Sequence, residues 1–232
     1  MKKLSKRVTE FQKLVDRNKS YSLSDAVALL QKVPKVKFDE AVDLAIQLGI
    51  DPKQSDQMVR GSVVLPHGIG KKVRVAVFCK GEESKAAQAA GADYVGSQDL
   101  IDKIQTGWLD FDVAVATPDM MRDLAKLGKI LGPRGLMPNP KTGTVTLDVA
   151  KAVKEAKAGK VEFKMNKLAG MNVSFGKISF AAPALVENAR AVIDSILRAK
   201  PQSVKGHYIK SMSISTTMGP GLRMDPAEYK EE

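Results

Sequence analysis

Hydrophobic positions near the N-terminus recur at helical spacing. They predict an amphipathic, basic first helix with the apolar residues Leu4, Val8, Phe11 and Val15. A second helix is predicted to begin at Ser22, because Ser22 and Asp25 have the spacing of a capping box, and to stop before Pro34.

The spacing then changes to the alternation of half-buried strands. Apolar and polar residues alternate over residues 38–50, and residues 61–65 are predicted to return as the partner strand. The same alternation reappears at residues 161–165 and in a strand that ends near Phe180. A helix starting at Pro183 follows, and a last strand covers residues 209–218.

Between these regions the pattern is that of an α/β unit. The continuous apolar runs at residues 73–78 and 111–116 are typical of strands buried on both faces. Helical stretches are predicted at residues 82–90, 99–104, 120–127 and 148–157, with a short strand at 93–95. This alternation favours a mostly parallel sheet covered by helices.

The return of the first pattern after the α/β unit predicts an inserted domain. Residues 1–66 plus 159–232 would form one split α+β domain, and residues 67–158 a second, α/β domain inserted through two neighbouring linkers. Both linkers contain glycine, so the sequence predicts a hinge.

Small hydroxyl side chains line one face of the predicted last strand. Ser211, Ser213, Ser215 and Thr217 share a face, whereas Met212, Ile214 and Thr216 point to the other. Residues 195–224 contain no acidic residue and the cations Arg198, Lys200, Lys205, Lys210 and Arg223. This strand is either a solvated edge or a surface for a sugar-phosphate backbone.

Charge favours an anionic partner. The chain has 37 Lys and Arg against 26 Asp and Glu, a net charge of +11, and the split domain carries +8 of it. No apolar run is long enough to span a bilayer, and the N-terminus lacks a signal-peptide pattern, so we expect a cytoplasmic protein. A single cysteine, Cys79, and two distant histidines predict neither a disulfide framework nor a metal site.

Enzyme-like patterns are incomplete. The glycine- and proline-rich residues 128–146 carry three cations but no phosphate-loop motif, so they are a phosphate-binding loop or, more simply, a shaped surface for RNA or protein. Gly68-Ile69-Gly70 precedes a strand rather than following one, as a dinucleotide fingerprint would. Cys79 ends a predicted parallel strand, where a core cysteine is the simpler interpretation.

Two further groups of residues suit RNA. Phe38, next to Lys37, is either ordinary core or a ring that lies against ribose or base. Lys164, Asn166 and Lys167 follow a strand and are either a solvated turn or phosphate contacts. Aromatic residues are only 5% of the chain, which favours structured RNA over stacked single strands.

Several stretches together resemble the bacterial L-one family of large-subunit ribosomal proteins. They are Phe38-Asp39-Glu40, Leu48-Gly49-Ile50-Asp51, Val59-Arg60-Gly61, Leu65-Pro66-His67-Gly68, residues 128–146 and residues 213–220. Two positions differ from the family pattern: Asn166 stands where aspartate is frequent, and Ala41 where threonine is common.

The resemblance implies a split domain that binds the stalk helices of the large ribosomal RNA and an inserted, Rossmann-like three-layer domain that moves. It also implies a role in releasing exit-site transfer RNA and, in some members, repression of the protein's own operon messenger RNA. Position by position, it implies RNA contacts at Phe38, Ser211, Thr217, Met218 and Gly219.

We therefore expect an RNA-binding component of the large ribosomal subunit, without catalytic activity, cofactor, metal or membrane partner, and monomeric when free. Phosphates would be contacted by Lys37, Lys164, Lys167, Lys205 and Lys210, beside Asn166. Shape and 2′-hydroxyl groups would be recognised by Phe38, Ser211, Ser213, Thr217, Met218 and Gly219. The alternative is an α/β enzyme that binds a nucleotide in the inserted domain.

Overall fold

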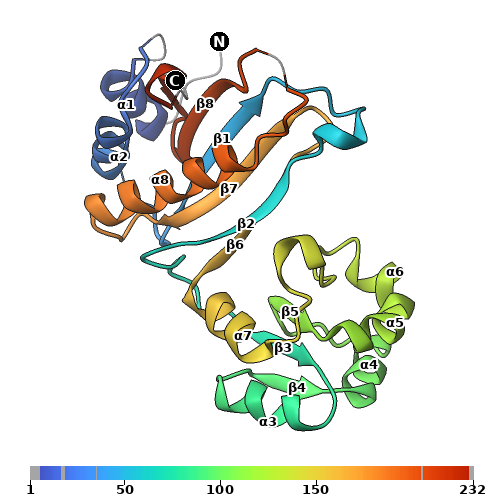
Figure 1. The fold of residues 1–232 in the computed structure, drawn as a ribbon. Coiled ribbons are helices and arrows are strands. Elements are labelled where there is room, and N and C mark those ends of the chain that lie inside the picture. The colour runs from blue at the N-terminus through green and yellow to red at the C-terminus, as the bar shows by residue number, and fades with distance from the viewer. Residues whose placement is uncertain (1–5, 17–18, 35, 205, 230–232) are drawn as a thin grey trace. The chain divides into compact units, whose positions relative to one another are not determined.

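The computed structural model describes residues 6–16, 19–34, 36–204 and 206–229, and has a mixed α/β fold (Figure 1). Contacts between residues divide it into two compact units. Unit 1 comprises Met1–Gly70 with Val161–Glu232, and unit 2 comprises Lys71–Lys160. Among the described residues, no helix combines the length and apolarity that a bilayer crossing requires.

Unit 1 is built on a four-stranded antiparallel sheet in the order β7-β1-β8-β9, with a separate two-stranded sheet of β2 and β6. Its elements are α1 (Lys6–Leu14), α2 (Leu23–Lys32), β1 (Ala41–Leu48), η1 (Ser55–Gln57), β2 (Arg60–Val64), β6 (Lys160–Lys164), β7 (Gly170–Lys177), α8 (Ala182–Arg198), β8 (Ile209–Thr216), β9 (Leu222–Met224) and η5 (Pro226–Tyr229).

One prediction about strand pairing was wrong. Residues 61–65 do form a strand, β2, but β2 pairs with β6, whereas β1 lies between β7 and β8. Alternation along a strand shows only which face is buried. The partners of β1 come from residues more than 120 positions away, and local sequence does not reveal them.

Helices α2 and α8 pack on the apolar face of the four-stranded sheet. Ser22 caps α2 as predicted, with its hydroxyl accepting a hydrogen bond from the backbone N–H of Asp25 at 3.2 Å. The helix predicted to start at Pro183 is confirmed as α8, and its apolar residues Leu185, Ala189 and Val192 are fully buried in this core.

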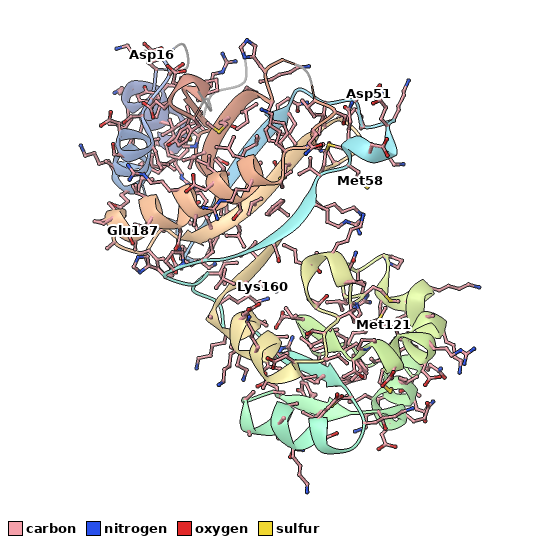
Figure 2. The ribbon with its side chains drawn as sticks, in the orientation of Figure 1. Asp16, Asp51, Met58, Met121, Lys160 and Glu187 are labelled. Carbon is pink, nitrogen blue, oxygen red and sulfur yellow. The ribbon has the colours of Figure 1, made fainter. Side chains whose placement is uncertain are left out.

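The segment that follows β2 is held against α8. Asn188 is fully buried; its side-chain oxygen accepts the N–H of His67, and its amide donates to the carbonyls of Gly68 and Phe175. Glu187, labelled on α8 in Figure 2, pairs with His67 at 2.6 Å. Residues 67 and 68 therefore belong to unit 1, and by contacts the first boundary falls after Gly70.

Unit 2 contains a three-stranded parallel sheet in the order β4-β3-β5. Its elements are β3 (Val75–Phe78), α3 (Glu82–Ala89), β4 (Tyr94–Gly96), α4 (Gln98–Gln105), β5 (Val113–Ala116), η2 (Pro118–Met120), α5 (Met121–Leu124), η3 (Ala125–Leu127), α6 (Gly128–Leu131), η4 (Pro140–Thr142) and α7 (Val149–Ala158). The single helix predicted over residues 120–127 is instead a series of short helical turns that runs on to Leu131.

Candidate RNA interface

The four-stranded sheet of unit 1 has one apolar and one polar face. On β1, Val42, Leu44, Ile46 and Leu48 are buried, whereas the residues between them are only half-buried. On β8, Met212, Ile214 and Thr216 are buried, so the hydroxyl row lies on the opposite, polar face as predicted. The register places Ser211, Ser213 and Ser215 opposite Gln47, Ala45 and Asp43.

Asp43 also lies on this polar face, although it was not among the residues predicted from the sequence to contact RNA. It lies between Ser215 on β8 and Ser174 on β7, whose hydroxyl donates to its carboxylate. The serine hydroxyls therefore have an acidic neighbour as well as cationic ones. Alternation along β1 already put Asp43 on the polar face, but its neighbours depend on long-range pairing.

Beyond β8 the chain forms a tight turn over Thr216–Gly219. The N–H of Gly219 donates to the carbonyl of Thr216 at 3.2 Å, which leaves Thr217 and Met218 at the exposed centre of the turn. A side chain at Gly219 would collide with the hydroxyl of Thr216, so the turn requires glycine there. Met218 is 57% exposed, and β8 ends at Thr216, two residues before the end predicted for this strand.

Thr217 is fastened to the start of β1. Its hydroxyl accepts the N–H of Ala41 at 3.1 Å, and its own N–H donates to the carbonyl of Ala41 at 3.1 Å. These bonds use only the backbone of Ala41, so the alanine that departs from the family pattern leaves them intact. Thr217 therefore stabilises the turn and is itself exposed.

Phe38 and Lys37 precede β1 and are both exposed, with Phe38 at 53%. The core interpretation of Phe38 is therefore wrong. Two residues further on, the side chain of Glu40 accepts the N–H of Met218, which places this segment beside the turn. Lys37, Phe38, Thr217, Met218 and Gly219 thus gather at one end of the polar face, and we call them the turn cluster.

A second group lies at the other end of β1. The side-chain oxygen of Asn166 accepts the N–H groups of Leu168 and Gly170, both at 2.8 Å, and Gln47 on β1 donates to the carbonyl of Leu168. Asn166 thus shapes the turn that exposes Lys167, and an amide oxygen suffices for this.

Three more predicted site residues lie toward this end. Lys164 is exposed on β6, Ser211 faces Gln47, and Lys210 is the extra residue where the β1–β8 register shifts. Lys164, Asn166, Lys167, Lys210 and Ser211 form what we call the basic end. The eight residues of β1 span about 25 Å, so the two groups are separate and joined by the serine row. Lys205 lies outside the described residues.

In unit 2, the last part of the segment 128–146, residues 144–146, pairs with Ala116 at the carboxyl end of β5. Ala116 donates to the carbonyl of Thr144 and accepts from the N–H of Thr146. Ligands of open α/β sheets bind at such strand ends, and here backbone occupies part of that edge. The first four residues of the segment are helical, unlike the irregular loop expected, and Lys129, Arg134 and Lys141 are exposed.

Cys79 is 1% exposed, as a core cysteine would be. Burial raises the pKa of its thiol, a hydrogen bond with Ser84 lowers it and the charge of Glu83 raises it, with burial the largest effect. A raised pKa leaves little of the nucleophilic thiolate. Among the described residues, no three histidine, cysteine or acidic side chains are grouped so that they could hold a metal ion.

One comparison with known proteins bears on this interface. The family model described as "Ribosomal protein L1p/L10e family" matches residues 30–220 of the 232. The match includes β1, both turns and the whole of β8. It supports a structural ribosomal protein that binds ribosomal RNA and resides in the ribosome, a cytoplasmic particle in bacteria. The chain belongs to the ribosomal protein L1p/L10e family.

Proposed function

We propose that unit 1 binds the stalk helices of the large ribosomal RNA through the polar face of its four-stranded sheet, with the turn cluster as the specific contact. The observation that carries this proposal is the partly exposed row of serine hydroxyls leading to an exposed Thr217-Met218 turn next to Phe38. Small hydroxyl side chains permit close approach to ribose, and 2′-hydroxyl groups are both donors and acceptors.

The lysines of the basic end would contact phosphates and add affinity without sequence preference. Lys164, Lys167 and Lys210 are exposed, and no salt bridge is formed by them within the described part of the chain. Asp43 would accept hydrogen bonds from 2′-hydroxyl groups, and the serines would either donate to them or accept from them. The face would therefore recognise the backbone and shape of a folded RNA.

Unit 2 is, in this proposal, an inserted Rossmann-like domain that moves on its two linkers. Family membership suggests that the protein takes part in releasing exit-site transfer RNA. It also suggests that the same surface of unit 1 represses translation by binding a similar structure in the protein's own operon messenger RNA. The free protein would be a monomer without cofactor.

The test measures binding of the full chain, and of a variant with unit 2 replaced by a short linker, to a stalk-helix fragment and to an unrelated hairpin over a salt series. We expect both proteins to prefer the stalk fragment, and hairpin binding to weaken steeply with salt. Equal binding of both RNAs, or selectivity that requires unit 2, would contradict the proposal.

The enzyme alternative is addressed by a thermal shift with ATP, GTP and NAD. Any of them that binds the folded chain stabilises it by mass action. We expect no shift in melting temperature, and a clear stabilisation by one of them would favour a nucleotide-binding α/β enzyme.

A further inference from the structure

Glu40 is a buried acid directly behind the turn cluster. It is only 3% exposed, and its Oε1 accepts the backbone N–H of Met218 at 2.9 Å. A carboxylate is an unexpected neighbour for a surface that attracts phosphate. Burying a charge is also costly unless it is paired and hydrogen-bonded, so its presence needs a physical reason.

Arg7 on α1 supplies the pairing charge. Its Nη2 lies 3.4 Å from Oε1 of Glu40, and its guanidinium stacks over the ring of Phe11 at 5.0 Å. Phe11 is itself buried, so the next turn of the same helix supports Arg7. A chain of contacts therefore runs from α1 through Arg7 and Glu40 to the backbone of Met218.

The carboxylate has a specific effect on the turn. Hydrogen bonds to an ionised acceptor are roughly twice as strong as neutral ones, so Glu40 holds the N–H of Met218 more firmly than an amide or water would. Arg7 offsets the negative charge that would otherwise repel RNA. Hydrogen bonds to Ala41 and Thr216 fix Thr217 and Gly219. Between them, at the centre of the turn, the backbone N–H of Met218 is held by Glu40.

We infer that Glu40 and Arg7 are positioning residues for RNA recognition, and that α1 thereby belongs to the RNA interface without its Arg7 touching RNA. The role of the turn in RNA binding rests on the proposed function above; the link from Glu40 to Met218 does not. Glu40 would pre-organise the turn, so that binding does not have to order it.

The test compares four variants of the full chain: Glu40→Ala, Glu40→Gln, Arg7→Met and the double variant Arg7→Met with Glu40→Gln. Affinity is measured for the stalk-helix fragment and the unrelated hairpin at one salt concentration, and hydrogen exchange of the Met218 amide is followed by NMR. Glu10→Ala is the matched control, because Glu10 is exposed on α1 and carries the same charge.

We expect Glu40→Ala to bind the stalk fragment about tenfold more weakly, since it leaves the N–H of Met218 without its acceptor. Hairpin binding should stay unchanged and exchange at Met218 should accelerate. Glu40→Gln keeps an acceptor and should restore affinity to within about threefold of wild type. Glu10→Ala should behave as wild type in all measurements.

Arg7→Met should weaken stalk binding because it leaves a buried carboxylate unpaired, and adding Glu40→Gln should recover most of that loss. If Arg7 instead contacts phosphate, both RNAs lose affinity and Glu40→Gln rescues nothing, which overturns its positioning role. Wild-type affinity and slow Met218 exchange in Glu40→Ala would overturn the inference about Glu40.

Two outcomes separate this inference from the proposed function. If the wild-type chain does not distinguish the two RNAs, the proposed function fails, whereas accelerated Met218 exchange in Glu40→Ala would still establish the link to the turn. If Glu40→Ala does not fold, the affinities of Glu40→Gln and Arg7→Met for the two RNAs remain a test. A purely structural role predicts that a variant loses affinity equally for the stalk fragment and the hairpin.

Discussion

In unit 2 the central strand β3 is buried on both faces: Ala76 and Phe78 belong to one hydrophobic cluster, and Val75 and Val77 to another. In unit 1 the central strand β1 buries Leu44 and its even-numbered neighbours, while the other face stays partly open and polar. An antiparallel sheet can leave one face to water, whereas a parallel sheet with crossover helices is covered on both. This difference explains why unit 1 has an extended polar face, the one proposed above to bind RNA, whereas the strand β3 of unit 2 is buried on both faces.

The largest expected effects come from removing core side chains. Phe78→Ala in unit 2 and Leu44→Ala in unit 1 should each lower the free energy of unfolding by about 3–4 kcal/mol, because both side chains are fully buried and leave cavities. Denaturant unfolding monitored separately for each unit measures this.

RNA binding should distinguish these two variants. Phe78→Ala should keep selectivity for the stalk fragment, whereas Leu44→Ala should lose affinity as unit 1 becomes less stable. Leu44→Ile is the control, because a volume-conserving swap costs less than about 1.5 kcal/mol. Loss of selectivity in a folded Phe78→Ala protein would place part of the interface on unit 2.

The next largest effects concern the turn cluster. Met218→Asp should weaken stalk binding by about 1–3 kcal/mol, since it places a carboxylate where phosphate is expected and next to Glu40. Thr217→Val should have an effect at the lower end of that range, because it removes the hydroxyl that accepts the N–H of Ala41. Titration with labelled RNA measures both.

Leu147→Asp is the matched control for Met218→Asp. Leu147 is 72% exposed in unit 2, so the same charge is introduced outside the proposed interface. It should leave affinity unchanged. If both Met218→Asp and Thr217→Val bind the stalk fragment like wild type, the turn cluster is not the contact.

A smaller effect is expected at the basic end. Lys167→Ala should weaken binding of both RNAs by a similar factor and reduce the slope of log affinity against log salt by about 1, because one phosphate contact is lost. Lys103→Ala, an exposed lysine on α4 of unit 2, is the control and should not change the slope. A loss confined to the stalk fragment would mean that Lys167 reads structure rather than charge.

The last prediction concerns unit 2 at acid pH only. Hydrogen bonds from Lys71 and from the backbone and side chain of Arg74 lower the pKa of Asp112 to about 2, against the opposing effect of its burial. Its stabilisation is therefore complete above about pH 4 and is lost as pH falls through about 2. Asp112→Asn should reduce the decrease in the melting temperature of unit 2 as pH falls, and should leave RNA binding at neutral pH unchanged. If the melting temperature falls with pH as in wild type, Asp112 is not the cause of that decrease.

Much of the local structure could be predicted from the sequence. The Ser22 cap, the helix that starts near Pro183 and the two faces of β8 follow from residue types and side-chain spacing, and the structure confirms them. The partner of β2 was predicted wrongly, and Phe38 could not be assigned to surface or core, because each depends on residues distant in the chain.

By itself, the sequence determined which residues share a face, because the periods of helices and strands are fixed by backbone geometry. It also determined the family, because residues 30–220 carry its pattern. Only the tertiary structure decided that Glu40 lies behind Met218, that Asp43 faces the serines and that Asn166 shapes a turn with Gln47. These contacts join segments up to 178 positions apart, and strand pairing, not local pattern, brings them together.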